Sequence, residues 1–374
     1  MKPTEICFFS PGAYPLFNPT VSGAFGGAEL QSFLLSSELS KDPGFVVSFI
    51  VGDYGQPPVE TFNGITVYKL AAESKQGPAL WRQISFAIRL WRLLKTVRAD
   101  VYQQRASGAS AGIIALYCRK ARKKFIYMTA SEADLKGGLR NRTFVEERMF
   151  KFGLTNADLI FTQNSQHQQI LKEKFHRESI VLKNVLTIPA RDVNQKRESV
   201  LWVASSQPLK QPEMFLQLAR DFPSEKFVMI MPPHAHNQAL AEKITEEAEA
   251  ISNLTLLGKV PFEQITEYYG QAKVLVSTST FEGFPNTFVQ AAASATPILS
   301  LGVNPDNFLD KEKCGFCAGG DYKKMATQLS EILGNPALWK SLSENGYRYA
   351  LENHDIVRNT ARYKSAVAEL LRNE

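Results

Sequence analysis

Short apolar segments alternate with longer amphipathic segments along the whole chain. The longer segments have the apolar spacing of helices, and in the first half they predict helices at residues 28–39, 79–97, 142–154 and 166–174. The short segments predict strands at residues 5–10, 46–51, 100–104, 124–128, 158–163 and 179–182, and in the second half at residues 200–204, 227–231, 254–257, 273–277 and 297–300. Apolar strands that alternate with helices are typical of parallel sheets covered on both faces. The pattern therefore predicts an α/β protein.

The distribution of charge and the length of 374 residues both indicate two domains. Residues 1–190 hold 24 Lys and Arg against 15 Asp and Glu, a balance of +9, whereas residues 191–374 hold 19 against 22, a balance of −3. The polar segment 187–198 lies where this balance changes, and we interpret it as a linker. We therefore expect two doubly wound domains, residues 1–188 and 189–356, that face each other across a cleft. Such sheets bind ligands outside the carboxyl ends of their strands.

The composition excludes several classes of protein. With 44% apolar and 21% charged residues, the chain is neither collagen-like, disordered nor a disulfide scaffold. The apolar run 6–9 is too short for a signal peptide, and no stretch approaches the roughly 20 apolar residues of a membrane helix. Four unevenly spaced cysteines indicate a reducing compartment, so we expect a cytoplasmic protein. Cys314 and Cys317 form a single CxxC without nearby histidines, which predicts two ordinary thiols and no zinc site.

A glycine-rich loop follows the first predicted strand. Gly23, Gly26 and Gly27 lead into the helix at 28–39, whose N-terminus offers N–H groups to an anion. The spacing G-x-x-G-G comes late after the strand and does not match the G-x-G-x-x-G fingerprint of dinucleotide-binding dehydrogenases. The alternative is a flexible loop without a ligand.

The segment 277–290 carries the most chemical information. A strand ends, Glu282 and a glycine follow, and Pro285 marks a helix start. The N–H groups of this helix start suit a phosphate, and Glu282 can accept hydrogen bonds from the hydroxyls of a sugar. Asn286 and Gln290, four residues apart, share one face of the helix. The alternative is a capped helix after a buried strand, which does not require an acid, a glycine, a proline and an amide in this order.

The run Glu282-Gly283-Phe284-Pro285-Asn286, with Gln290 and Thr296-Pro297-Ile298 after it, resembles the Glu-x7-Glu element of retaining nucleotide-sugar glycosyltransferases of family 4. Further segments are similar to that family in the same order: Gly26-Gly27-Ala28-Glu29, residues 157–160, Gly258 with Val260, Gly315 with Gly320-Asp321, and residues 339–363. The resemblance implies the GT-B fold, with an N-terminal acceptor-binding domain and a C-terminal donor-binding domain. It also implies that the last helix, residues 357–374, packs back onto the N-terminal domain.

The resemblance assigns roles to individual residues. Lys210 matches the lysine that neutralises the donor pyrophosphate, and Glu282 matches the carboxylate that holds donor hydroxyls. Ser205 stands where the family usually has arginine, and Gln290 stands where it has a second glutamate that binds ribose. The donor-binding residues implied in this way are Gly26, Gly27, Ser205, Gly258, Val260, Gly283, Phe284, Pro285, Asn286, Thr287 and Gln290.

The acceptor side departs further from the family. Many relatives have a histidine after the strand at 124–128, where this chain has Thr129-Ala130-Ser131-Glu132-Ala133-Asp134. Ser131, Glu132 and Asp134 are therefore the candidates to orient an acceptor hydroxyl. The alternative is a pair of solvated loop carboxylates with Ser131 as a cap.

The implied function is transfer of a hexosyl or N-acetylhexosaminyl group from a nucleoside diphosphate sugar, as co-substrate, to a glycan or lipid-linked glycan in cell-surface polysaccharide synthesis. No metal or other cofactor is expected. Trp81, Trp91 and the basic run 119–124 make an anionic membrane surface a candidate partner, with a peripheral location on the inner face. A core helix with solvated cations is the alternative, and nucleic acid is not expected.

Two other functions remain open. Ser205 and Gln290 are consistent with a degenerate, non-catalytic partner subunit, whereas Lys210 and Glu282 oppose that interpretation. A nucleotide-sugar 2-epimerase needs additional acids or histidines for proton abstraction. The five histidines, at positions 167, 176, 234, 236 and 354, lie outside the loops discussed above.

Overall fold

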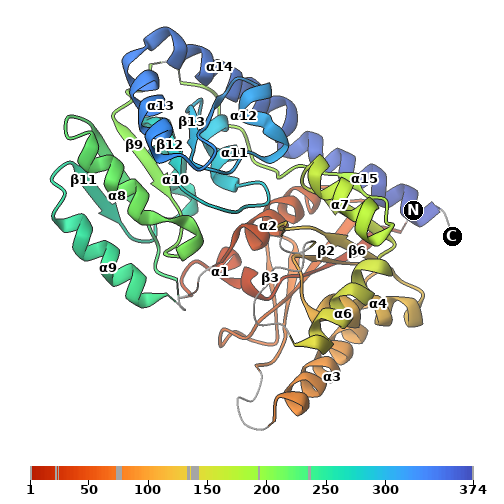
Figure 1. Ribbon diagram of the computed structural model, residues 1–374. Coiled ribbons are helices and arrows are strands. Elements are labelled where there is room, and N and C mark those ends of the chain that lie inside the picture. Colours follow the sequence, from red (N-terminus) through yellow and green to blue (C-terminus); the bar gives the residue numbers. More distant parts are fainter. Residues whose placement is uncertain are drawn as a thin grey trace. The chain divides into compact units, whose positions relative to one another are not determined.

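The computed structural model describes residues 2–21, 23, 25–72, 78–132, 135, 143–192, 194–234 and 237–372 (Figure 1). The chain forms two compact units. The first consists of Met1–Val185 and Ile356–Glu374, and the second of Leu186–Asp355. Each unit is built around one sheet.

The first unit contains an eight-stranded sheet in the order β3-β4-β2-β1-β5-β6-β7-β8. Its strands are β1 (Thr4–Phe9), β2 (Phe45–Val51), β3 (Val59–Phe62), β4 (Ile65–Lys69), β5 (Val101–Arg105), β6 (Lys124–Met128), β7 (Leu159–Thr162) and β8 (Ile180–Val181). The pairing is parallel throughout, except that β3 runs antiparallel to β4 at the edge.

Helices cover both faces of this sheet. They are α1 (Tyr14–Phe17), α2 (Gly27–Leu39), α3 (Ala79–Val97), α4 (Ala109–Ala121), α6 (Phe144–Thr155), α7 (Ser165–Phe175) and α15 (Ile356–Arg372), with a 3-10 turn, η1 (Pro11–Ala13), after β1. Successive residues of β1 point to opposite faces, and both sets are buried. Cys7 and Phe9 pack with α3, α4, α6 and α7, whereas Ile6 and Phe8 pack with α1, α2 and α15.

The second unit contains a fully parallel six-stranded sheet in the order β11-β10-β9-β12-β13-β14. Its strands are β9 (Ser199–Val203), β10 (Lys226–Ile230), β11 (Leu254–Leu257), β12 (Ala272–Ser277), β13 (Ile298–Ser300) and β14 (Gly315–Cys317). Its helices are α8 (Pro212–Asp221), α9 (Gln238–Glu249), α10 (Phe262–Gln271), α11 (Asn286–Ala293), α12 (Phe308–Lys311), α13 (Tyr322–Gly334) and α14 (Pro336–Asn353), with 3-10 turns η2 (Pro208–Lys210) and η3 (Pro305–Asn307). Two apolar clusters fill its two faces.

The two sheets confirm the predicted α/β class with two Rossmann-like sheets. Each predicted strand is present, with its ends displaced by at most one residue. The described elements that the prediction lacks include α1, α4, β14 and the two strands of the β3–β4 hairpin. The hairpin turns at Asn63 and Gly64, whose φ angles of 47° and 82° are those of a type I′ turn.

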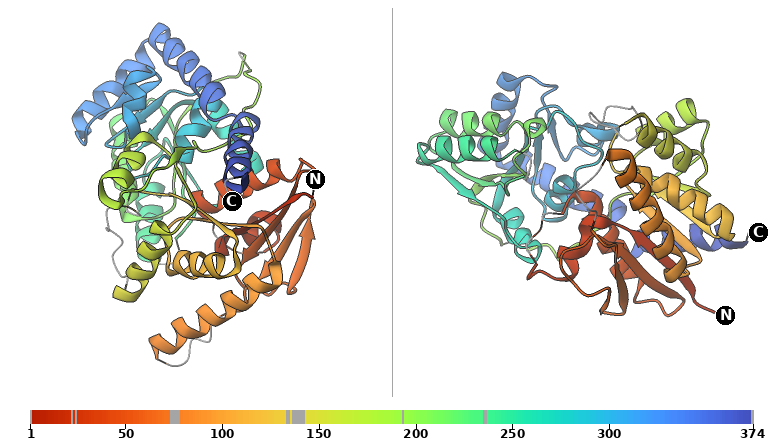
Figure 2. Two further views of the ribbon diagram at one scale, coloured as in Figure 1. Left: turned by 90° about the vertical axis from the view of Figure 1, so that its right-hand side faces the viewer. Right: turned by 90° about the horizontal axis from the view of Figure 1, so that it is seen from below.

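Helix α15 belongs to the first unit, although the whole second unit precedes it in the chain. It packs beside α2 (Figure 2). Tyr363 is fully buried, and its hydroxyl donates to Gln103 Oε1 at 2.5 Å. Lys364 pairs with Asp42 at 2.8 Å. None of the helices that the structure describes has the length and apolar character needed to cross a membrane.

Helices α4 and α6 approach each other closely because glycines lie at their crossing. A Cβ atom on Gly112 would lie 2.3 Å from the carbonyl oxygen of Met149, and one on Gly153 would lie 2.5 Å from the carbonyl carbon of Ala111. Any larger residue would therefore push the two backbones apart. This contact fixes the position of α6 on the first unit.

We expect Gly112→Ala to lower the free energy of unfolding by about 1–3 kcal/mol, because the added methyl group overpacks this crossing. Urea denaturation measures the change. Gly334→Ala is the matched control, since Gly334 also lies in a helix but has no atom within 4 Å of an added Cβ. The control should be neutral or slightly stabilising, because alanine favours a helix by about 1 kcal/mol over glycine. Equal effects of the two substitutions would contradict the close approach.

Candidate functional site

The strand order of the second unit reverses between β9 and β12. The chain moves outward from β9 through β10 to β11, and then returns to the other side of β9 as β12. In an open parallel sheet, the loops that follow two such strands diverge and leave room for a ligand at the carboxyl edge. The loop after β9 contains Lys210, and the loop after β12 contains Glu282. The topology thus brings these two predicted residues to the same place.

Hydrogen bonds to main-chain carbonyl oxygens hold the two loops together. The hydroxyl of Thr278 donates to the carbonyl oxygen of Lys210 at 2.6 Å and accepts from Trp202 Nε1 at 2.9 Å. The N–H of Thr280 donates to the carbonyl oxygen of Leu209 at 2.9 Å. Thr278 and Trp202 are both buried. We call this set of contacts the loop clamp.

The side chains of Lys210 and Glu282 form an ion pair across the clamped loops. The two side chains are only 16% and 22% exposed. The hydroxyl of Ser279 donates to the same carboxylate oxygen, Glu282 Oε1, at 3.1 Å. A cation and a hydrogen-bonded carboxylate therefore lie side by side at the carboxyl edge. The cation suits an anionic group, and the carboxylate can accept from hydroxyl groups.

The residues after Glu282 turn the chain into α11. Phe284 is buried and packs on Phe308 and His354, with ring centroids 5.1 and 5.2 Å away, so its side chain serves the core. Gly283 is buried as well, and Pro285 is the N-cap of the helix. Asn286 and Thr287 form the first turn of α11, where the helix dipole favours an anion.

Gln290 lies on α11 one turn beyond Asn286. Its Oε1 atom accepts a hydrogen bond of 3.1 Å from the hydroxyl of Tyr269 on α10. Burial raises the pKa of Tyr269 far above its usual value, so this hydroxyl remains protonated and keeps donating. The tyrosine thus fixes the amide of Gln290. Nothing in the sequence motif indicates this partner.

The structure distributes the other predicted residues of this unit along the same edge. Ser205 lies in the loop after β9, where its hydroxyl accepts from Gln207 Nε2 at 2.8 Å. Gly258 is exposed directly after β11, and Val260 packs against the apolar cluster on one face of the sheet. Ser205 follows β9, which is next to β12, the strand before Glu282. Gly258 and Val260 follow β11, which is separated from β12 by β10 and β9.

The remaining predicted residues belong to the first unit. Gly26 is the N-cap of α2 and Gly27 its first residue. The N–H of Gly26 donates to Glu29 Oε2 at 2.9 Å, and Gly12, after β1, lies against the same glutamate. The N-terminus of α2 is therefore capped by the carboxylate of Glu29, the last residue of the Gly26-Gly27-Ala28-Glu29 run.

The loop after β6 contains Ser131 and Glu132, both half-buried, whereas Asp134 lies outside the described residues. A buried histidine that the sequence analysis set aside lies next to this loop. The Nδ1 atom of His167, in the first turn of α7, is 3.1 Å from Thr129 Oγ1. Gln163 Nε2 donates to the carbonyl oxygens of Thr129 and Ala130 at 3.0 Å each. The sequence indicates the proximity of His167 to this loop only through the order of elements, since α7 follows β7 and the loop follows the adjacent strand β6.

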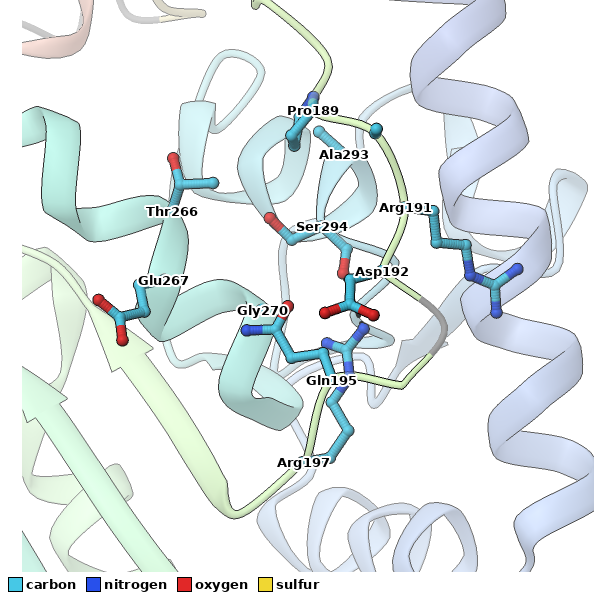
Figure 3. A pocket seen from close by; sticks show the side chains of 11 residues that line it. Pro189, Arg191, Asp192, Gln195, Arg197, Thr266, Glu267, Gly270, Ala293 and Ser294 are labelled. Atoms are coloured by element: carbon cyan, nitrogen blue, oxygen red, sulfur yellow. Dashed lines mark hydrogen bonds between the residues drawn. The ribbon is translucent and has the colours of Figure 1, made fainter.

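A separate cavity of about 140 Å³ lies at the opposite edge of the second sheet, beside the segments that precede β9, β12 and β13 (Figure 3). Arg197 lines it and donates to Thr296 Oγ1 at 2.8 Å and to the carbonyl oxygen of Ser294 at 3.0 Å. Burial, together with the nearby Arg191, lowers the pKa of Arg197 to about 10, so it is still charged at neutral pH. The guanidinium of Arg197 therefore binds a carbonyl oxygen at the C-terminal end of α11 and balances the negative end of its helix dipole. We do not assign the cavity to the candidate site.

The cysteines and acids do not form a metal centre in the part of the chain that the structure describes. No group of three or more His, Cys, Asp or Glu side chains there could hold a metal ion. Cys314 is buried, and this burial raises the pKa of its thiol to about 12. Cys317 is the last residue of β14 and is half-buried, so the CxxC pair consists of two free thiols at the two ends of this short strand.

The family model described as glycosyl transferases group 1 matches residues 197–335, which lie within the second unit. This match covers little more than a third of the chain, so it makes the second unit similar to this family. The two Rossmann-like sheets have the GT-B fold.

Individual proteins are more distantly similar. An uncharacterised glycosyltransferase of Methanocaldococcus jannaschii is 22% identical over 58% of this chain and 60% of its own length. The alpha-monoglucosyldiacylglycerol synthase of Acholeplasma laidlawii is 25% identical over 36% of this chain and 33% of its own length. The chain thus spans a third to three fifths of these relatives.

Solved structures match over nearly the whole chain. Sucrose-phosphate synthase of Thermosynechococcus elongatus has a TM-score of 0.81 at 16% identity and covers 99% of this chain and 100% of its own. HepE of Anabaena, in a complex with UDP and glucose, has a TM-score of 0.71 at 14% identity and covers 98% and 100%. At these identities the likeness concerns the fold.

We expect Thr278→Val to lower the free energy of unfolding by about 2 kcal/mol, because it leaves a buried indole N–H and a carbonyl oxygen without their partner. Thr280→Val is the matched control in the same loop, since the hydroxyl of Thr280 is exposed and makes a longer, 3.2 Å hydrogen bond. Urea denaturation should show a change within about 0.5 kcal/mol for the control. Similar losses from both variants would mean that the clamp does not depend on the buried hydroxyl.

Proposed function

We propose that this protein is a retaining glycosyltransferase that moves a hexosyl or N-acetylhexosaminyl group from a nucleoside diphosphate to a hydroxyl acceptor. The observation that carries the proposal is the ion pair of Lys210 and Glu282 at the strand reversal of the second unit. The match of residues 197–335 to the model of the group 1 glycosyltransferases supports it. The complex of HepE with UDP and glucose supports a nucleotide-sugar donor by analogy of fold.

In this proposal Lys210 binds the diphosphate of the donor. The side chain of Lys210 is only 16% exposed, and its Nζ cation stabilises the charge that gathers on the departing phosphate. The first turn of α11, at Asn286 and Thr287, adds the positive end of a helix dipole. With arginine absent at position 205, the diphosphate depends on this one side-chain cation more than in relatives with the usual motif.

Glu282 holds the hydroxyls of the transferred sugar. Before the donor binds, its carboxylate neutralises Lys210. The arriving phosphates replace the carboxylate as the partner of Lys210, and the carboxylate then accepts hydrogen bonds from the sugar. Without a donor, the ion pair therefore holds both side chains in position and neutralises the charge of each.

The transfer step needs no side-chain nucleophile. The acceptor oxygen forms a bond to the anomeric carbon of the sugar as the bond from that carbon to the phosphate oxygen breaks. The acceptor proton passes to the leaving phosphate on the same face, so the configuration is retained and the products are the glycoside and the nucleoside diphosphate.

We propose that the acceptor is a glycan or a lipid-linked glycan of cell-surface polysaccharide synthesis, met by the first unit on the cytoplasmic side of a membrane. The loop with Ser131 and Glu132 is the candidate acceptor loop, and the contacts of Thr129 with His167 and Gln163 hold its beginning in place. The name of the A. laidlawii relative, a synthase of a glucosyl lipid, supports a lipid-bearing acceptor.

We expect Lys210→Ala to reduce the rate of nucleoside diphosphate release by about a hundredfold or more, because one charge-stabilising contact is worth on the order of 3 kcal/mol in the transition state. The assay incubates the purified protein with a panel of nucleotide sugars and acceptor glycans and measures released nucleoside diphosphate. Lys210→Arg should retain part of the rate, because it retains the cation.

Lys273→Ala is the matched control for this substitution. Lys273 forms an ion pair with Glu225 at 2.6 Å, with the side chains 33% and 23% exposed, but it lies at the start of β12, away from the carboxyl edge. Its loss should leave the rate within threefold of wild type. A folded Lys210→Ala variant with wild-type activity would overturn the proposal. Interconversion of nucleotide sugars without an acceptor would indicate an epimerase, and no turnover on any donor would indicate a non-catalytic subunit.

We expect Gln290→Glu to raise the affinity for nucleoside diphosphate about fivefold, since an additional charge-assisted hydrogen bond to ribose is worth about 1 kcal/mol. One carboxylate oxygen can continue to accept from Tyr269 while the other faces the ribose. Gln290→Ala should weaken binding. Isothermal titration calorimetry measures both variants, and an affinity that neither variant changes would show that residue 290 does not contact the nucleotide.

A further inference from the structure

An apolar group of side chains is exposed on one edge of the first unit. Trp81 is 67% exposed at the start of α3, and Ile84 and Ile88 follow it at helical spacing on the same face. Phe144 is 74% exposed at the start of α6, with Val145 beside it. Isolated exposed apolar residues are ordinary, but large ones gathered on neighbouring helix starts mark an interaction surface.

The two helix starts lie next to each other. Gln83, between Trp81 and Ile84 on α3, has its Nε2 atom 3.5 Å from Thr143 Oγ1, and Thr143 is the N-cap of α6. Figure 1 shows α3, α4 and α6 together on the same side of this unit. We call the exposed residues Trp81, Ile84, Ile88, Phe144 and Val145, with the cations of α3, the α3–α6 surface.

Positive charge continues the apolar stripe along α3. The exposed face runs from Trp81, Ile84 and Ile88 to Arg92 and Lys95. Residues 79–97 contain four cations and no Asp or Glu. Of the two acids at the start of α6, Glu146 bonds to the N–H of Thr143 at 2.9 Å and Glu147 pairs with Lys151 at 2.8 Å.

The fold does not use this exposed face of α3. The opposite face supplies the packing, with Leu90 and Leu94 fully buried. Trp91, which the sequence analysis grouped with Trp81 at a membrane, instead stacks edge-on against Tyr117 with ring centroids 5.3 Å apart. The exposed tryptophan and isoleucines are therefore available to a partner.

We propose that the α3–α6 surface docks reversibly on an anionic lipid bilayer. Trp81, Ile84 and Phe144 enter the boundary between headgroups and acyl chains, and Arg92 and Lys95 lie over the anionic headgroups. An aromatic and aliphatic group beside a helix with only positive charge is complementary to such a surface. The inference rests on the proposed function, which already places the first unit at a membrane, and adds the surface by which it docks. Docking does not require catalysis, so a vesicle experiment tests it separately from the transfer reaction.

Docking of this surface would also present the candidate acceptor loop to the membrane. Helix α3 follows β4 and helix α6 follows β6, so both begin on the side of the carboxyl edge of the sheet. Residues 129–132 lie at the same edge, directly after β6. A lipid-linked acceptor would therefore meet the protein on the side where the protein meets the membrane.

The test is flotation of the full chain with vesicles of phosphatidylcholine alone or with 30% phosphatidylglycerol, at 0.1 and 1 M NaCl. We expect binding to the anionic vesicles at low salt. Binding should fall at high salt, because the Debye length shrinks from about 10 Å to about 3 Å. Arg92→Gln/Lys95→Gln should lower the partition coefficient about thirtyfold, since each cation contributes about fivefold at an anionic surface. Trp81→Gln/Ile84→Gln/Phe144→Gln should abolish binding.

Two matched controls remove the same kinds of side chain elsewhere. Lys323→Gln/Lys340→Gln removes two exposed cations of the second unit, and Val59→Thr/Leu351→Gln/Val357→Gln removes three exposed apolar side chains outside the surface. Both should bind vesicles like wild type. Circular dichroism confirms that each variant is folded. Losses in the controls as large as in the surface variants would overturn the proposal.

Tryptophan fluorescence tests the orientation separately. Trp81 is the exposed one of the four tryptophans, so its emission should shift to the blue when anionic vesicles are added. Trp81→Phe should still float with the vesicles but lose the shift. A shift that persists in Trp81→Phe would contradict the docked face. Dimerisation of the lipid-free protein that the apolar triple variant abolishes would assign the surface to a second copy of the chain and overturn a lipid partner.

Discussion

The hydroxyl of Thr278 is the group on which the candidate site depends. A parallel sheet brings the loops after β9 and β12 to one edge, but it leaves the loops free to differ by several ångströms. Thr278 removes that freedom by joining the main chain of Lys210 to the indole of Trp202 in the core. An ion pair that still contacts solvent gains little free energy by itself, too little to order two loops. The charges of Lys210 and Glu282 are therefore placed by neutral, buried hydrogen bonds.

The fold was predictable wherever burial acts on both faces of a strand. β1 from Ile6 and β9 from Val200 read as continuous apolar runs because side chains on both faces of these strands enter a core. β3 alternates between exposed and half-buried residues at a sheet edge, so its apolar pattern is weak. The Asn63-Gly64 dipeptide was the feature of the sequence that indicated a hairpin there. α4 starts with small residues and is buried almost all round, which removes the amphipathic period. β14 begins with Gly315, whose place against Ile298 is decided by tertiary contact.

The site was predictable in its chemistry and less so in its contacts. Lys210 and Glu282 follow strands and match a motif, so the sequence indicated both. The partners of these groups are set by packing between distant segments: Trp202 and Thr278 are 76 residues apart, and Tyr269 and Gln290 are 21 apart on different helices. His167 was overlooked for the same reason, because its contact with Thr129 exists only once β6 and β7 pair.

The position of α15 in the first unit sets the order in which the chain can fold during synthesis. Tyr363 and Val367 belong to the core on one face of the first sheet, yet they are synthesised after the whole second unit. The second unit, Leu186–Asp355, is complete before they emerge. Domains fold as units while they are synthesised. The unit that is made first therefore finishes last, and until then one face of its sheet lacks the helix that covers it, so that a nascent chain arrested near residue 355 would be a substrate for chaperones.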